Sequence, residues 1–201
     1  DPPPMTTSAQ NVYTRRMNFF LVKKAFFDMW DNFLAVILMN LGFIAIMTIP
    51  ILLPAPLASV SVYLALASQA IGILAIFIYA GGVAMACRDI ANYERPEFKK
   101  FFEYIKETWL SSLILGLINL GIIVVLWIGV PVYAAMGNLL GLVALVFLFW
   151  ALVIWLLSSQ FYLPIRAQLD TKIGKIIKKS FIIFFDNTFF AIVVGIGTIA
   201  V

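Results

Sequence analysis

The stretch Lys99–Trp109, KKFFEYIKETW, and the long apolar run after it decide how the chain is organised. A Lys pair opens the stretch, aromatic residues fill it, and the acid Glu107 stands eight residues after the first Lys. The pattern returns at residues 23–31 and 178–186, each time ahead of another apolar run. The sequence therefore predicts an internal repeat of three units, in each of which a charged amphipathic segment leads into a membrane span.

The composition is that of a membrane protein. Of the 201 residues, 63% are hydrophobic and 12% are charged, whereas soluble domains are about 45–50% apolar and about 25% charged. This composition excludes a soluble or nucleic-acid-binding protein, and a single cysteine, Cys87, excludes an internal disulfide. The chain has no His, which excludes His-ligated zinc sites and Ser-His triads.

The apolar runs predict an all-α fold, a polytopic membrane helical bundle. Spans are expected at about 32–53, 62–87, 110–133 and 139–164, with a fifth starting near Asn187. Only 15 residues follow Asp186, or roughly 22 Å of helix, against a hydrocarbon core of about 30 Å. We therefore expect five spans in this chain and a sixth that is missing from it.

The predicted domain plan is simple. Residues 1–16 are expected to be a flexible N-terminal segment, in which residues 1–4 precede the first Met and look like a cloning remnant. Residues 17–201 form one transmembrane domain. Its repeats, each a cytoplasmic amphipathic helix plus a transmembrane hairpin, are expected at about 17–87, 96–165 and 171–201, the third incomplete.

The repeat is supported by an ungapped alignment of its first and third copies. Lys23 falls on Lys178 and Gly42 falls on Gly197. The alternative is coincidence, because lysines, acids and aromatics are common at membrane interfaces. In each copy, including residues 96–109 of the second, we expect the amphipathic helix to lie flat at the interface.

Orientation follows from the positive charges. All 14 Lys and Arg residues lie in three segments, and the loops at about 54–61 and 134–138 carry none. Because cytoplasmic loops are enriched in Lys and Arg, the N-terminus and the amphipathic segments are placed in the cytoplasm. Their lysine pairs are expected to attract anionic lipid or a cytoplasmic partner. These residues are Lys23, Lys24, Lys99, Lys100, Lys178 and Lys179.

Three polar residues lie within the predicted spans, namely Asn40, Gln69 and Asn119. They are expected to make interhelical hydrogen bonds, or alternatively to line a cavity between the repeats.

Three acids stand where the chain enters a span, namely Asp31, Glu107 and Asp186. They are expected to complement the positive end of a helix dipole; the alternative is a shared cation site. No catalytic, cofactor-binding or metal-ligating residue is expected, and hence no cofactor and no enzyme.

Several stretches carry a family resemblance: residues 79–88 (YAGGVAMACR), 98–102 (FKKFF), 111–117 (SSLILGL) and 163–166 (LPIR). In these the chain resembles the YesL-like family of small polytopic proteins of the bacterial inner membrane. The resemblance implies six spans, a location in that membrane and a link to carbohydrate uptake. It assigns no catalytic residue.

Two functions remain open at this point. The first is a non-enzymatic accessory or scaffold protein that docks lipid, an ABC-type uptake system or another membrane protein through its amphipathic helices. The second is a small-molecule transporter or channel with a cavity between the repeats.

Overall fold

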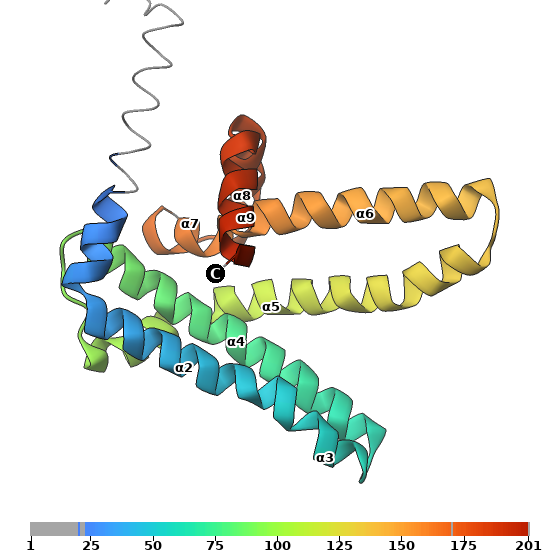
Figure 1. The fold of residues 1–201 in the computed structure, drawn as a ribbon, viewed down its shortest axis with the longest axis horizontal. Coiled ribbons are helices and arrows are strands. Elements are labelled where there is room, and N and C mark those ends of the chain that lie inside the picture. Colours follow the sequence, from blue (N-terminus) through green and yellow to red (C-terminus); the bar gives the residue numbers. More distant parts are fainter. Residues whose placement is uncertain (1–19, 21–22, 170, 201) are drawn as a thin grey trace, which may run out of the picture.

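The structure is a computed structural model that describes residue 20 and residues 23–169 and 171–200, and all the regular structure in these residues is helical. The predicted N-terminal segment, 1–16, lies outside them. A short helical segment at 23–31 comes first. The elements that follow (Figure 1) are α2 (Phe33–Leu52), α3 (Pro54–Ala58), α4 (Val62–Ala91), α5 (Phe98–Ala135), α6 (Leu139–Ser159), α7 (Tyr162–Gln168), α8 (Ile173–Asp186) and α9 (Thr188–Ala200).

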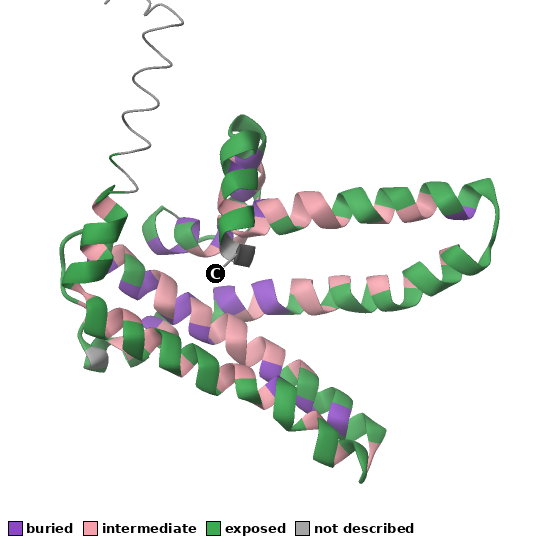
Figure 2. Cartoon of the chain, viewed as in Figure 1, coloured by how far each residue is buried: buried purple, intermediate pink, exposed green. Residues whose placement is uncertain are grey.

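The all-α, multi-pass prediction is confirmed by the length and hydropathy of the helices. Four of them are long and apolar enough to cross a membrane, and a bent pair, α8 with α9, makes up to five. The four spans are Phe33–Ala58, Val62–Ala91, Lys99–Ala135 and Leu139–Gln168. Exposed and half-buried residues cover most of these helices, and buried residues concentrate on α4, on the stretch of α5 that crosses it, and on α7 (Figure 2).

Two helical hairpins diverge from a common crossing point. Helices α2 and α4 run side by side, and so do α5 and α6, while the two hairpins splay apart toward their tips (Figure 1). The most extensive helix–helix contact lies between α4 and α5. The crossing of α4 and α5 therefore joins the two halves of the molecule.

A pair of glycines on α4 lets the two helices approach closely. A Cβ added to Gly81 would collide with Ser112 Oγ and lie 2.8 Å from Thr108 Oγ1, and one on Gly82 would lie 2.7 Å from Ile105 Cγ1. In a membrane the hydrophobic effect does not drive helices together, because lipid is as apolar as their side chains. Small residues at a crossing let the two backbones approach closely enough for van der Waals packing. The AGG sequence of the second span is therefore a helix-packing site.

The prediction of a separate interfacial helix at 96–109 is wrong. That segment continues without a break into α5, a single helix of 38 residues, or about 57 Å. The other two copies do break, at Asn32 (φ −113°, ψ 26°) and at Asn187 (φ −133°, ψ 48°).

The difference lies in the dipeptide at the break. Copies one and three carry Asp-Asn, whereas copy two carries Glu107-Thr108. Asn side chains compete with the helix by bonding to nearby backbone groups, and the Asn32 amide donates to the carbonyl of Asp28 at 2.9 Å. In copy two, Thr108 is buried at the crossing and bonds back to the Tyr104 carbonyl at 2.8 Å. α5 runs through this position without a break, as it does at Asn119, whose amide makes the same kind of bond to the Leu115 carbonyl. Whether the three units are related as repeats stays a prediction.

We predict that Gly81→Ala destabilises the protein by about 1–3 kcal/mol, the usual cost of overpacking a tight contact. The added methyl would collide with Ser112 Oγ, so combining it with Ser112→Ala should recover part of the loss. The measurement is the midpoint of thermal unfolding in detergent. Gly121→Ala is the matched control, since no atom lies within 4 Å of its added Cβ. Equal midpoints for the two single variants would contradict the tight crossing.

Candidate functional site

Two arginines, one at the end of each hairpin, reach into the helix crossing. Arg88 lies at the end of α4 and Arg166 lies in α7, which follows α6. Arg166 bonds directly to α5, whereas Arg88 is linked to α5 through Asp89, which accepts a hydrogen bond from Tyr104. We call Arg88, Asp89, Tyr104, Glu107, Ser111, Tyr162 and Arg166 the arginine network.

Arg88 holds a buried carboxylate. Its Nε and Nη2 donate to Asp89 Oδ1 at 3.0 and 2.7 Å, and Asp89 is only 5% exposed. The Tyr104 hydroxyl donates to the other oxygen of the same carboxylate. Arg88 Nη1 lies 3.5 Å from the carbonyl oxygen of Ala167. One carboxylate and one guanidinium thus join the ends of α4, α5 and α7.

Arg166 is itself nearly buried, at 8% exposure. Its Nε donates to Ser111 Oγ at 3.0 Å, and its Nη2 donates to the backbone carbonyl of Glu107 at 2.8 Å. The Glu107 carboxylate lies 3.6 Å from Nη1 and remains largely exposed. The Tyr162 hydroxyl donates to the Ser111 carbonyl at 3.1 Å. These bonds fasten α7 to α5.

From the sequence, these arginines are predicted only to mark the cytoplasmic side. One feature of the sequence could have indicated their role in packing. The hydroxyl residues Thr108, Ser111 and Ser112 stand at helical spacing on an otherwise apolar stretch. All three are buried at the crossing, and Ser112 Oγ has no hydrogen-bond partner among the described residues. Small polar residues at that spacing indicate a close helix contact.

The three acids expected at helix starts occupy different positions. Asp31 and Asp186 are exposed and stand just before α2 and α9, and their role at those helix starts stays a prediction. Glu107 lies inside α5, so the expectation that it complements a helix start is wrong; its partner is Arg166. Across the described residues, no group of three His, Cys, Asp or Glu side chains is placed to hold a metal ion.

The three intramembrane polar residues do not meet. Asn119 bridges α5 and α6, because its amide donates to the Leu115 carbonyl at 2.8 Å and its Oδ1 accepts from Trp155 Nε1 at 3.2 Å. Asn40 is exposed on α2 and Gln69 is exposed on α4.

The paired lysines have different environments. Lys24 Nζ lies 2.6 Å from Asp28 Oδ2, donates to the Ala91 carbonyl at 3.1 Å, and sits 4.3 Å from the Tyr93 ring centroid. Its hydrogen bond to Asp28 raises the pKa of Lys24. Lys24 therefore ties the segment 23–31 to the end of α4.

The other paired lysines are more accessible. Lys23, Lys99 and Lys178 are exposed, and Lys179 is half-buried. Lys100 is exposed and lies 3.9 Å from Glu97 Oε1. Within this group, Lys23, Lys99 and Lys178 present their charges most openly.

A groove of about 810 Å³ opens between α2 and the start of α5. Its walls come from α2, from Tyr79 and Ala86 of α4, and from residues 95–105. Ligand sites typically measure about 300–1,000 Å³, so the groove has the size of a binding site. Asn40, Gln69 and Asn119 do not line it.

Comparison with known proteins adds no relative: no family model, curated protein or solved structure matches the chain. The resemblance to the YesL-like family stays a prediction from its motifs.

We predict that Arg166→Met loosens α7 from α5 and lowers the free energy of unfolding by about 1.5–3 kcal/mol, the range for hydrogen bonds to a charged group. Arg166→Lys should recover only part of this, because an ammonium lacks the planar fork that reaches both Ser111 and Glu107. Detergent unfolding curves measure both effects, with the exposed Lys106→Met as control. A loss from Lys106→Met as large as that from Arg166→Met would contradict this role.

Proposed function

We propose that the protein is a non-enzymatic scaffold of the cell membrane that holds anionic lipid headgroups on its cytoplasmic side, chiefly through α8. The observation that carries the proposal is the bend of 102° between α8 and α9. If the apolar α9 enters the bilayer along its normal, α8 must lie close to the membrane plane.

The faces of α8 suit a helix at an interface. One face packs on α6 and α7 through the buried Ile176 and Phe184. The exposed face carries Lys175 and Lys178 in its first half, and Ile182 and Phe185 in its second half. An interfacial helix places basic residues among headgroups and apolar residues at the acyl boundary. This division of the exposed face supports lipid contact along the whole helix.

The cytoplasmic assignment is supported by the sequence. Every Lys and Arg lies in the three basic segments, and the loops at the hairpin tips have none. The positive-inside rule then places the N-terminus and α8 in the cytoplasm.

The finer setting rests on the family resemblance alone. That resemblance favours the bacterial inner membrane and an accessory role in carbohydrate uptake, with an ABC-type system or another membrane protein as partner. The transporter alternative has less support, because Asn119 is bonded to Trp155 and the groove is lined by other residues.

We predict that Lys175→Gln with Lys178→Gln weakens binding of anionic lipid by about 2 kcal/mol, or roughly 30-fold, from about 1 kcal/mol per basic residue near a charged surface. Native mass spectrometry of the protein with phosphatidylglycerol measures the change. Binding should also weaken as salt is added.

The matched control is Lys99→Gln with Lys106→Gln, which removes the same charge from exposed sites on α5. An equal loss from both pairs would mean that net charge, not α8, attracts the lipid. That result would overturn the assignment to α8.

A further inference from the structure

We propose that the groove between α2 and the start of α5 binds one phospholipid whose headgroup carries a phosphate and a primary amine. This site is separate from α8, and none of its lining residues comes from α8. The inference rests on the groove's depth, its apolar walls and the charges at its mouth.

The groove has the depth of one membrane leaflet. Along α2 its lining runs from Phe33 to Ile46, which is roughly 20 Å at 1.5 Å per residue. Half of a hydrocarbon core is about 15 Å, so the groove extends from the headgroup level to near the bilayer centre. Its mouth adjoins the basic segments, which places it in the cytoplasmic leaflet.

The walls of the groove are apolar below the mouth. Leu38, Met39 and Ile46 come from α2, and Phe101 and Ile105 come from α5. The Tyr79 hydroxyl also lines the groove, but it already donates to the Met39 carbonyl at 2.8 Å. The deep part therefore suits an acyl chain rather than a polar solute.

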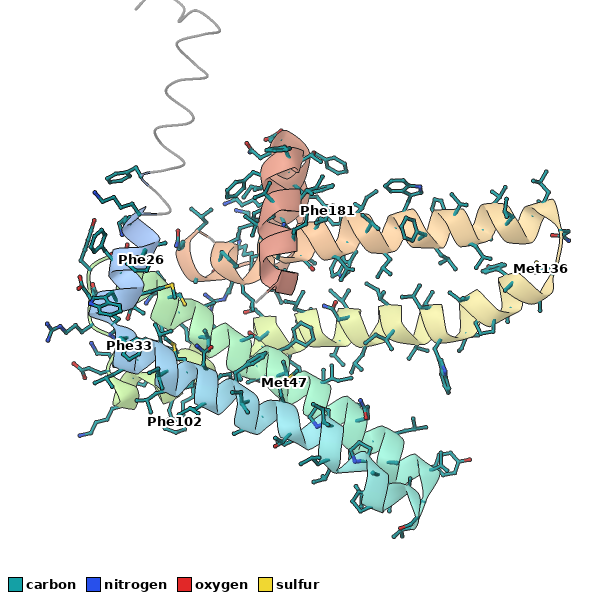
Figure 3. The ribbon with its side chains drawn as sticks, in the orientation of Figure 1. Phe26, Phe33, Met47, Phe102, Met136 and Phe181 are labelled. Atoms are coloured by element: carbon teal, nitrogen blue, oxygen red, sulfur yellow. The ribbon has the colours of Figure 1, made fainter. Side chains whose placement is uncertain are left out.

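Aromatic side chains surround the mouth. Trp30, Phe33 and Phe102 line the groove there, and all three are exposed. Figure 3 places Phe33 of α2 and Phe102 of α5 at the same end of the α2–α4 hairpin. Aromatic residues are enriched at the level of the headgroups, which agrees with the depth assigned to the mouth.

The charges at the mouth match a zwitterion. Arg95, Asp31 and Glu97 line it. Glu97 lies 3.9 Å from Lys100, whereas neither Arg95 nor Asp31 has an ion pair with another residue that the structure describes. Arg binds phosphate through charge-assisted hydrogen bonds, and a carboxylate accepts such bonds from an ammonium. A cation and an anion at one mouth thus fit a phosphate and an amine on one molecule.

This pairing discriminates among common phospholipids. Phosphatidylethanolamine offers both a phosphate and an N–H donor. Phosphatidylcholine has a quaternary amine, which donates no hydrogen bond to Asp31. Phosphatidylglycerol has no amine, so it offers the Asp31 carboxylate hydroxyl donors but no cation. The groove should therefore prefer the ethanolamine lipid to both.

The test is native mass spectrometry of the purified chain with these three lipids of identical acyl chains. We expect the ethanolamine lipid to bind about tenfold more tightly than the choline lipid, which is about 1.4 kcal/mol. Asp31→Asn should bring that ratio close to one. Arg95→Gln should weaken both lipids about tenfold and leave their ratio unchanged. Glu103→Gln and Lys106→Gln, exposed residues outside the lining, are the charge-matched controls.

Two further measurements distinguish binding of the whole lipid from attraction of its headgroup alone. Leu38→Trp should block the apolar part and weaken all three lipids while the unfolding midpoint stays near that of the parent chain. Glycerophosphoethanolamine, which has no acyl chains, should fail to compete.

Equal binding of ethanolamine and choline lipids to the parent chain would overturn the proposal, as would effective competition by the chain-free headgroup. Equal effects of Asp31→Asn and Glu103→Gln would overturn it as well. Lys175→Gln with Lys178→Gln should leave the ethanolamine preference intact, so the two lipid proposals fail independently.

Discussion

The close approach of α4 and α5 is the constraint on which the rest of the molecule depends. In a bilayer, apolar helix surfaces gain little from leaving lipid for each other, so association relies on tight packing and hydrogen bonds. Gly81 and Gly82 supply the space, and Thr108 and Ser112 occupy it. The other main contact between the two halves is that of α4 with α7. The crossing of α4 and α5 is therefore the principal link between the two hairpins.

The arginine network extends this crossing toward the end of the bundle that carries the basic segments. Arg88 and Arg166 lie at equivalent positions, each at the end of a hairpin, but they have different partners. Arg88 binds a buried carboxylate, whereas Arg166 binds a backbone carbonyl and a serine hydroxyl. Arg166 bonds directly to α5, and the carboxylate that Arg88 binds accepts a hydrogen bond from Tyr104 of α5. The position of α7 follows from Arg166 and Tyr162, and α8 packs in turn on α6 and α7. The placement of the exposed face of α8 therefore depends on bonds made at the crossing.

The spans were predictable because a long uncharged run has few alternatives in a membrane. The course of α5 was not predictable, because the amphipathic pattern of residues 96–109 fits both a helix that ends at the interface and one that continues into the span. The two copies that break carry Asp-Asn where copy two carries Glu107-Thr108. The arginine network was missed because the pairing of Arg166 with Ser111 is a tertiary contact. The groove was equally invisible, since it arises from the angle between α2 and α5 rather than from any motif.

An unbroken α5 is a lever pivoted at its contact with α4. From Ser112, the helix extends 14 residues toward Phe98 and 23 residues toward Ala135, or roughly 21 Å and 35 Å. A tilt about the pivot moves the two ends in opposite directions, and the longer arm moves farther. The short arm forms one wall of the groove, whereas the long arm carries the loop at the far side of the membrane. α5 thus connects the loop at the far side of the membrane to one wall of the groove through a single continuous helix, which carries Pro131 near its far end.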